Sequence, residues 1–414
     1  MLSALFIVVT ISFALTADTV AAENWPQFRG QNGNGHSSSS VPISWSETNN
    51  VAWKVPIRGT GHSSPVVFDG QVWLTTADQN GKKLFAICID ADTGKTIHDL
   101  EVFEVDTPQH VHTTNTHASP TAVVEKGRVY LHYGSYGTAC VDTRSGETLW
   151  TRRDLIVDHR HGPGSSPILV GDLLVLQFDG LDQQFMVTLN KRTGDTVWRK
   201  KRDIQYNSDN GERKKSFCTP LLVHHQGVAQ IVTVAARSAI AYDPSSGDVL
   251  WRVRFIGDSA TARPIYGENT LFITTSCIDA KLIAIRPELR GDITDKGVLW
   301  IQDKGIPQRP SSLFIDGLLY GIHDTGVLTC RDSKTGAPVW RRRLGGNFAA
   351  SPVFAGGLIY FPNDDGVTHV VRPGRTFESV SINKLDDGGY ASPAVANESI
   401  YLRTRKNLYR LTKR

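Results

Sequence analysis

A short turn motif recurs at regular intervals along the chain. Each copy has an Asp or Asn followed three residues later by Thr or Ser and then by Gly, as in Asp142 and Ser145-Gly146. Four copies carry a Trp four residues after the Gly. Since Gly takes the positive φ that a tight connection needs, each copy is expected to close a β-hairpin. The turns are Thr93-Gly94, Ser145-Gly146, Thr193-Gly194, Ser246-Gly247 and Thr335-Gly336, and the tryptophans are Trp150, Trp198, Trp251 and Trp340.

A second mark, most often Ser-Pro, precedes each hairpin and opens a short apolar run such as Val66-Val67-Phe68. The mean separation of these marks is about 47 residues, within the range of a four-stranded propeller blade. There are eight marks: Ser64-Pro65, Ser119-Pro120, Ser166-Pro167, Thr219-Pro220, Arg263-Pro264, Ser311-Ser312, Ser351-Pro352 and Ser392-Pro393.

The two marks together predict an all-β fold. Short apolar runs bounded by Gly or Asp, such as Leu358-Ile359-Tyr360-Phe361, are typical of buried strands. No stretch longer than about ten residues has helical periodicity, which argues against a parallel α/β fold. The 40% of hydrophobic residues excludes a disordered chain. We therefore predict an eight-bladed β-propeller of four-stranded antiparallel blades.

The ring has to close between its two ends. The last unit, Ser392 to Leu411, holds three short apolar runs but lacks the turn-and-Trp ending. Asn50-Val51-Ala52-Trp53-Lys54-Val55 stands before the first unit and reads as a lone outer strand with the repeat Trp. We expect this N-terminal strand to complete the last blade. Each repeat Trp should stack over the Gly turn of a neighbouring blade.

The N-terminus has the pattern of an export signal. Leu2 to Leu15 is apolar but too short to span a bilayer, and Val20-Ala21-Ala22 provides small residues for cleavage. We expect a signal peptide at residues 1–22, an N-terminal extension at 23–44, a propeller at 45–414, and a periplasmic or secreted mature protein. An uncleaved N-terminal anchor is the alternative. No Cys follows the apolar run, so no acyl anchor is expected.

Charge and cysteine usage exclude other classes. The net charge is only +4, from 45 Lys and Arg against 41 Asp and Glu, which argues against a nucleic-acid binder. No later segment is long and apolar enough to cross a membrane. The five cysteines form no C-x-x-C pair, and Cys88, Cys140 and Cys330 each lie two residues before a turn Asp. We interpret these three as small buried hydrophobes of equivalent strands. A monomer is expected.

The Asp-x-x-Thr/Ser-Gly-x-x-x-Trp ending and the eight units resemble the pyrroloquinoline-quinone-like propeller repeat family. Its members include quinoprotein alcohol dehydrogenases and the propeller lipoprotein of the outer-membrane β-barrel assembly machine. The opening Trp25-Pro26-Gln27-Phe28-Arg29-Gly30, with Asn32-Gly33-Asn34-Gly35, is similar to that of exported propeller proteins common in planctomycete-type bacteria. The resemblance covers essentially the whole mature chain and implies the fold, whereas activity resides in sites.

The enzymes of this family imply a pyrroloquinoline quinone cofactor held against a vicinal Cys-Cys disulfide, with a calcium site and a catalytic Asp. No two cysteines are adjacent here, and no position matches the calcium site by motif. The quinone is thus implied by the family resemblance alone, and no other cofactor is predicted. The assembly-machine lipoprotein is acylated on a Cys that this leader lacks.

Candidate ligand-binding residues lie in the loops that lead into the first strand of each blade, because these loops converge at one mouth of the channel. Three residues before the second residue of each mark stand His62, His117, Gly164, Phe217, Thr261, Arg309, Ala349 and Tyr390. From these loops we select His62, His117, His161, Lys215, Arg263, Arg309 and Tyr390. They would form an electropositive pocket for a small anionic molecule, a saccharide or a cofactor. Alternatively, they cap loops and bond to the backbone at the rim.

The residue types in these loops suggest two kinds of chemistry. His110-Val111-His112 and His117 could surround a metal ion, but no carboxylate or Cys stands at a diagnostic spacing, so no metal site is predicted. His62, His117, Arg309 and Tyr390 would suit proton abstraction beside a carboxylate-bearing sugar, with His or Tyr as the base and Arg neutralising charge.

The leading hypothesis is an exported binding or scaffold module that takes a protein partner or a ligand at the channel mouth. The alternatives are a quinoprotein-like oxidoreductase and a saccharide-active enzyme that uses the His/Arg/Tyr set. The sequence favours a non-enzymatic role over an enzymatic one.

Overall fold

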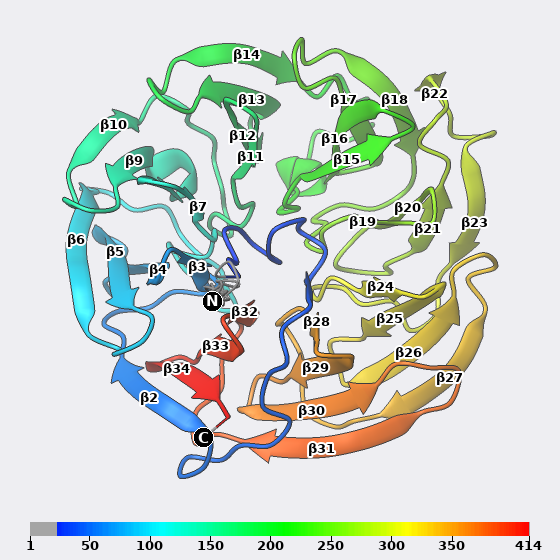
Figure 1. Ribbon diagram of the computed structural model, residues 1–414. Coiled ribbons are helices and arrows are strands. Elements are labelled where there is room, and N and C mark those ends of the chain that lie inside the picture. The colour runs from blue at the N-terminus through cyan, green and yellow to red at the C-terminus, as the bar shows by residue number, and fades with distance from the viewer. Residues whose placement is uncertain (1–22, 414) are drawn as a thin grey trace, which may run out of the picture.

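The computed structural model describes residues 23–413. The signal peptide expected at residues 1–22 lies outside the described residues. Eight sheets stand radially around a central channel, as predicted (Figure 1). The described helices are two short 3-10 turns, η1 (Gly134–Tyr136) and η2 (Gly211–Lys214). None of the helices in the described part is long and apolar enough to cross a membrane.

The first four blades follow one another along the chain, each from the channel outward. Blade 1 contains β3 (Val66–Phe68), β4 (Gln71–Ala77), β5 (Lys83–Asp90) and β6 (Thr96–Glu104). Blade 2 contains β7 (Val123–Glu125), β8 (Arg128–His132), β9 (Thr138–Asp142) and β10 (Thr148–Arg152). Blade 3 contains β11 (Ile168–Val170), β12 (Leu173–Asp179), β13 (Gln184–Asn190) and β14 (Thr196–Lys201). Blade 4 contains β15 (Leu221–His225), β16 (Val228–Ala235), β17 (Ser238–Tyr242) and β18 (Val249–Arg254).

The second half of the ring repeats this order with two additions from elsewhere in the chain. Blade 5 contains β19 (Ile265–Gly267), β20 (Thr270–Thr274), β21 (Leu282–Ile285) and β23 (Val298–Gln302). Blade 6 contains β24 (Leu313–Ile315), β25 (Leu318–Ile322), β26 (Val327–Asp332) and β27 (Pro338–Arg343). Blade 7 contains β28 (Val353–Ala355), β29 (Leu358–Pro362), β30 (Val367–Arg372) and β31 (Glu378–Lys384). Blade 8 contains β32 (Ala394–Ala396), β33 (Ser399–Arg403), β34 (Asn407–Thr412) and, as its outer strand, β2 (Val51–Pro56). The additions are β1 (His36–Ser37), parallel to β28, and β22 (Gly291–Asp292), parallel to β18.

The N-terminal strand closes the ring. β2 pairs antiparallel with β34, with Trp53 opposite Arg410 and Val55 opposite Leu408. This is the pairing that the lone Trp-bearing segment predicted. Because blade 8 takes strands from both ends of the described chain, unravelling either end exposes an unpaired strand edge.

The repeat Trp links five of the eight blades to the next one. The Trp150 indole donates a hydrogen bond from Nε1 to the Lys191 carbonyl at 3.0 Å and lies against Gly194, where an added Cβ would be 2.8 Å from the ring. This confirms the predicted stacking. The same Nε1-to-carbonyl bond joins Trp53 to Ala91, Trp198 to Pro244, Trp300 to Ser333 and Trp340 to Gly374.

The link from blade 4 to blade 5 departs from this pattern because of the connection that follows β21. The connection between β21 and β23 is long and includes β22, which pairs with the outer strand of blade 4. Trp251 is therefore fully buried and donates to the Gln230 side chain of its own blade, at 2.7 Å.

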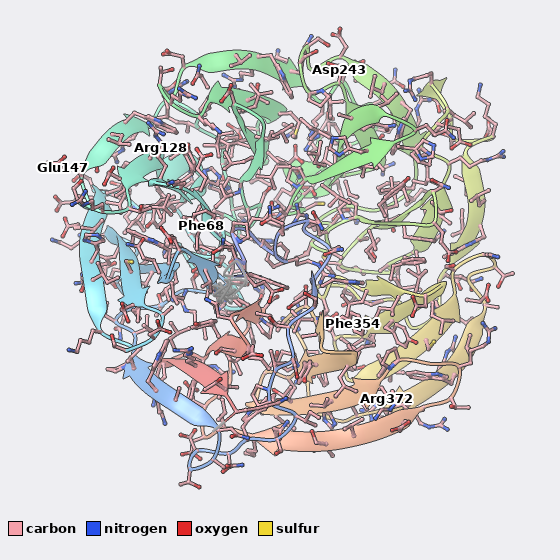
Figure 2. All side chains as sticks on the ribbon, viewed as in Figure 1. Phe68, Arg128, Glu147, Asp243, Phe354 and Arg372 are labelled. Carbon is pink, nitrogen blue, oxygen red and sulfur yellow. The ribbon has the colours of Figure 1, made fainter. Side chains whose placement is uncertain are left out.

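Side chains fill the space between neighbouring blades (Figure 2). Cys88, Cys140 and Cys330 are buried in the third strands of their blades, as expected for small apolar residues. Trp25 and Val41 of the N-terminal extension are buried in one cluster with residues of blades 1, 7 and 8. The extension is thus part of the core.

A ring of hydroxyl groups ties the inner strands together. Seven of the eight positions that lie two residues before an inner strand carry Ser or Thr. Each hydroxyl accepts a hydrogen bond from the backbone N–H at the same position of the preceding blade, as Thr121 does from Ser64 at 2.9 Å. In the other pairs, with the accepting hydroxyl named first and the donating N–H second, the residues are Ser166 and Thr121, Thr219 and Ser166, Ser311 and Arg263, Ser351 and Ser311, Ser392 and Ser351, and Ser64 and Ser392. We call these eight positions the hydroxyl ring, of which Arg263 is the exception.

The N-terminal extension crosses the central channel (dark blue in Figure 1). Trp25 pairs with Val67 in the middle of β3, and Gly35 accepts a hydrogen bond from Phe354 of β28. Arg29 is 2% exposed, and its guanidinium donates to the carbonyls of Ser311 and Ser312. In blades 1 and 7 these contacts are made with the inner strands themselves, which come after the hydroxyl-ring positions in the chain. The extension therefore fills the channel on that side of the hydroxyl ring.

Candidate functional site

A cavity of about 640 Å³ lies at the other end of the channel, at the face where the inner strands begin. We call this the mouth face and the space the mouth cavity. The residue four positions before each inner strand lines it in all eight blades. These residues are His62, Ser119, Gly164, Phe217, Thr261, Arg309, Ala349 and Tyr390.

The sequence reading placed seven of these eight residues and missed blade 2. There, Ser119-Pro120 stands two residues too early, since β7 begins at Val123. Thr121 holds the hydroxyl-ring position of blade 2, and Ser119 holds the mouth position. The Ser-Pro pair resembles the mark, because the sequence alone does not show how many residues separate a Pro from the strand that follows it.

His117, assigned to the mouth by that reading, is not among the cavity-lining residues. It is 7% exposed, its Nε2 lies 3.1 Å from the Gln109 carbonyl, and its ring packs near Tyr136 at 5.7 Å between centroids. Burial lowers the pKa of His117. These contacts match the alternative in which such residues hold their own loops.

Lys215 and Arg263 also lie off the cavity. The Lys215 side chain is fully buried and bonds to Glu212 and to Nδ1 of His161, the latter at 3.0 Å. Arg263 is 2% exposed and donates to the carbonyls of Phe28 and Pro220, so it points to the N-terminal extension. Arg263 replaces a hydroxyl in the ring and fastens the extension in the channel.

His62, Arg309 and Tyr390 converge on one wall of the cavity. The His62 and Tyr390 rings are 4.8 Å apart, and the Arg309 guanidinium lies 5.5 Å from the Tyr390 centroid. Burial, with the charges of Arg403, Arg405 and Arg309, lowers the pKa of His62 to about 3. His62 is therefore neutral at pH 7 and is a weak base.

His161 lies on the opposite wall. Its ring is 5.3 Å from that of His112, and its Nε2 is 3.8 Å from a Glu212 carboxylate oxygen. Burial and the Lys215 charge lower the pKa of His161. Thus four predicted residues, His62, His161, Arg309 and Tyr390, line the mouth cavity.

The charges of the lining are paired. Arg309 donates from Nε to Asp324 at 2.5 Å, and Arg213 lies 3.4 Å from Asp258. Glu212 is bonded to Lys215. The lining thus differs from the expected electropositive pocket. What it offers between these pairs is apolar surface from Phe217, Ile278 and Tyr390.

Three exposed isoleucines lie on the mouth face, and one of them, Ile278, lines the cavity. Ile256 and Ile278 are 78% and 71% exposed, and Ile156 is 57% exposed. All three lie in loops at the end where outer strands finish or second strands turn into third strands, which is the mouth face in an antiparallel blade. Apolar side chains gathered on one face mark contact surfaces for partners.

The carboxylates that hold the mouth loops were missed by the sequence reading. Asp324 Oδ1 accepts from the Gln308 and Arg309 N–H groups, and Asp364 Oδ1 accepts from Ala349 N–H. Both follow the second strand of their blade, in Asp324-Thr325-Gly326 and Asp364-Asp365-Gly366. Those Asp-x-Gly turns were a signal that could have located them.

The cavity does not fit the quinone cofactor of the resembling enzymes. Its lining includes one Cys, Cys277, so a vicinal disulfide cannot form there. Over residues 23–413, no three His, Cys, Asp or Glu side chains are grouped as a metal site would require. His110, His112 and His117 therefore do not form the cluster considered from the sequence.

Comparison with known proteins supports the repeat. The profile of the family described as "Outer membrane protein assembly factor BamB" matches residues 42–152, 86–288 and 237–372, which together span 42–372. No curated protein matches the chain.

Solved structures share the fold at low sequence identity. BamB from Moraxella catarrhalis is 13% identical with a TM-score of 0.59, and the match covers 87% of this chain and 99% of BamB. A europium-containing methanol dehydrogenase is 11% identical with a TM-score of 0.69, and the match covers 92% of this chain and 89% of the dehydrogenase. The quinohemoprotein alcohol dehydrogenase from Comamonas testosteroni is 12% identical with a TM-score of 0.67, and the match covers 95% of this chain and 81% of that enzyme.

These similarities establish the architecture, while the paired charges and the single Cys distinguish this mouth from the implied quinone site. The family match extends over most of the chain and coincides with the blades described above. The chain belongs to the pyrroloquinoline-quinone-like propeller-repeat family whose profile is described as outer membrane protein assembly factor BamB.

Proposed function

We propose that the protein is an exported binding module that takes a protein partner on its mouth face. The observation that carries this proposal is the mouth cavity itself, about 640 Å³ with an apolar lining that includes the exposed Ile278, and with paired charges. Partner proteins commonly insert apolar or aromatic anchor residues into such pockets. We expect an anchor side chain of the partner to pack against Phe217 and Tyr390.

The polar groups of the mouth would set the orientation of that anchor. His62 and Arg309 lie beside Tyr390, so one wall offers hydrogen-bonding groups while the other surfaces are apolar. Such an arrangement of few polar groups in an apolar pocket confers specificity. The assembly-factor description of the family is consistent with a protein partner.

The alternatives receive less support from this geometry. A base at the mouth that abstracts protons near pH 7 needs a pKa near 7, and the pKa of His62 is about 3. An oxidoreductase would need the quinone, whose implied Cys pair the lining lacks. A small ligand remains the second candidate, because the cavity is large enough for one.

Site-specific photo-cross-linking tests the proposal. A photoreactive residue at Ile278 on the mouth face is compared with one at Ile382, which is 64% exposed on the outer strand β31. In cells that produce the protein, we expect a discrete cross-linked product from position 278 and none from 382. The product should diminish when Phe217→Asp is added. Products from 382 alone, or a product at 278 that persists in Phe217→Asp, would contradict the proposal.

Export is part of the same proposal. It is supported by the sequence pattern of residues 1–22. N-terminal sequencing of the protein from a cell-envelope fraction is expected to begin at Glu23. A protein that begins at Met1 in the membrane pellet would instead support the uncleaved anchor.

A further inference from the structure

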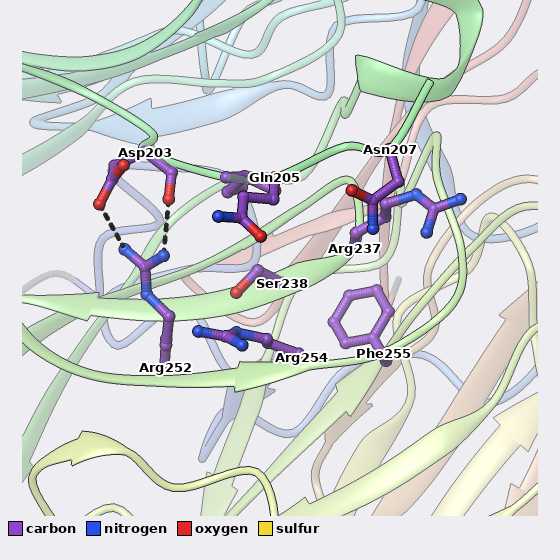
Figure 3. Close-up of a pocket in the computed structure, with 9 residues that line it drawn as sticks. Asp203, Gln205, Asn207, Arg237, Ser238, Arg252, Arg254 and Phe255 are labelled. Atoms are coloured by element: carbon purple, nitrogen blue, oxygen red, sulfur yellow. Dashed lines mark hydrogen bonds and ion pairs between the residues drawn. The ribbon is translucent and has the colours of Figure 1, made fainter.

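A second cavity, of about 280 Å³, lies between blades 3 and 4 (Figure 3). Its walls come from the segment after β14, the β16–β17 turn and the end of β18. Because neighbouring strands alternate in direction, these segments lie on the mouth face, outside the mouth cavity. We call this space the blade 3–4 pocket. None of its lining residues lines the mouth cavity.

The pocket contains three arginines with different partners. Arg252 donates to the Asp203 carbonyl at 2.6 Å and lies 3.8 Å from its carboxylate, as the dashed lines in Figure 3 show. Arg254 lies 2.9 Å from Asp292. Within residues 23–413, the Arg237 guanidinium has neither a hydrogen-bond acceptor nor an ion-pair partner, although the residue is half-buried.

The Arg237 nitrogens are not among the fully buried unpartnered polar atoms of residues 23–413, so the guanidinium can be reached from solvent by a ligand. Arg237 differs from the charged residues that line the mouth cavity, because each of those has an ion-pair partner. A bound anion would supply the missing partner. The planar guanidinium binds a carboxylate through two parallel hydrogen bonds.

The backbone of the pocket is strained as well. Asp203, Asn207 and Arg237 have φ values of 48°, 50° and 62°, in the left-handed region that most residues avoid. Such conformations persist where the surrounding structure enforces them, and they occur often at ligand-binding positions. Three of the fifteen non-glycine residues with positive φ in the described part of the chain lie in the two segments that line the pocket.

The remaining lining describes the rest of the ligand. Gln205 and Asn207 present amide groups, each able to donate and accept hydrogen bonds. Phe255 presents an aromatic ring at the base of the pocket (Figure 3). Amide groups suit hydroxyls, and an aromatic ring suits the C–H face of a saturated ring.

We propose that the blade 3–4 pocket binds a small hydroxylated carboxylate of the sugar-acid class. Arg237 pairs with the carboxylate, Gln205 and Asn207 bond to the hydroxyls, and Phe255 packs against the ring. The same chemistry is offered by a free hexuronate and by a uronate residue of a polysaccharide.

Calorimetric titration of the full mature chain with glucuronate tests this site. We expect saturable binding that Arg237→Asn weakens at least tenfold, since a charge-assisted pair is lost. Asn tolerates the left-handed conformation at this position, so the fold should be retained. Gln205→Ala, in an exposed segment, should weaken binding several-fold without changing the Tm.

The matched control is Arg144→Asn, an exposed arginine in a turn on the opposite face, which should change the affinity by less than twofold. Glucose tests the need for the carboxylate, and inorganic phosphate tests the preference for a planar anion. An oligouronate that binds more tightly than glucuronate indicates a polysaccharide source, whereas equal affinity indicates the free sugar acid; both support the site.

Several results would overturn the proposal. These are no saturable binding of glucuronate or oligouronate, equal binding of glucose, tighter binding of phosphate, or an equal loss of affinity in Arg144→Asn and Arg237→Asn. None of these results bears on the cross-link at Ile278, because the two cavities share no lining residue.

Discussion

Trp53 of the N-terminal strand donates a hydrogen bond from its indole Nε1 to the Ala91 carbonyl of blade 1, across 3.0 Å. Trp53 sits in blade 8 through the pairing of β2 with β34, so this one contact joins the last blade to the first. A Cβ at Gly94 would lie 2.9 Å from the same indole. The closure therefore uses the same Trp–turn contact that links four other pairs of neighbouring blades.

Removing this indole should weaken the whole ring. We expect Trp53→Ala to lower the free energy of unfolding by about 3 kcal/mol, because a large aromatic contact is lost at the joint. Trp53→Phe keeps the stacking and should cost about 1 kcal/mol. Urea denaturation measures both. Leu149→Ala, on the exposed side of β10, is the control and should stay within about 0.5 kcal/mol. Equal stability of Trp53→Ala and this control would contradict the closure.

The hydroxyl ring gives a second stability prediction. Thr219→Val keeps the shape of the side chain but removes the acceptor for the Ser166 N–H, which is buried. The unsatisfied donor should cost about 1–3 kcal/mol. Thr148→Val, at an exposed position of β10, should be nearly neutral. Thermal unfolding of the two variants measures the difference. A Thr219→Val protein as stable as Thr148→Val would show that these bonds contribute little.

The contacts of Arg29 predict how the extension is held. Arg29→Ala removes hydrogen bonds to Ser311, Ser312 and Pro352, so residues 23–44 should leave the channel more often. Limited proteolysis should cut this segment at least tenfold faster than in the unchanged protein. Arg58→Ala removes an exposed ion pair with Asp99 and a cation–π contact with Phe85, neither of which involves residues 23–44, and it serves as the control. Identical cleavage rates in both variants would refute the anchoring role of Arg29.

His132 predicts a pH dependence of stability. It is 2% exposed, its Nδ1 lies 2.8 Å from the Thr138 hydroxyl, and burial lowers its pKa to about 3. Between pH 6.5 and about 3 the unfolded chain binds the proton and the folded chain does not, so the free energy of unfolding falls as the pH falls. The slope from one such group is at most about 1.4 kcal/mol per pH unit.

The variant His132→Asn isolates this contribution from that of the carboxylates. Urea denaturation at pH 7 and pH 4.5 should show a smaller acid loss in His132→Asn than in the unchanged protein. His224→Asn, at an exposed position of β15, should leave the loss unchanged. An acid loss that is the same in all three proteins would show that His132 does not control it.

The fold could be predicted from the sequence because the same local motifs recur from blade to blade. The Gly turns, the Trp slot and the Ser or Thr before each inner strand each determine a contact that is repeated around the ring. Blade 5 was predicted through Arg263-Pro264, but its extra strand β22 was not, because the segment around Gly291 pairs with a neighbouring blade through a tertiary contact. In blade 2 the Ser119-Pro120 pair imitates the mark two residues early.

The candidate site was less predictable for a related reason. Register along the repeat located the mouth positions of His62, Arg309 and Tyr390, since these depend only on distance from a strand. Lys215 and Arg263 are close to that register, but their side chains are drawn away by Glu212 and by the N-terminal extension. Long side chains choose partners that are remote in sequence, and no local pattern specifies such a choice.

The affinity of the cross-linked partner tests the central claim most directly. Once that partner is purified, its binding is titrated against the unchanged protein, Phe217→Asp and Ile382→Asp. A charge in the mouth cavity should weaken binding at least 30-fold, the loss of about 2 kcal/mol expected at an anchor pocket, while a charge on β31 should change it less than twofold. Equal affinities for all three proteins, or a greater loss in Ile382→Asp, would contradict binding at the mouth face.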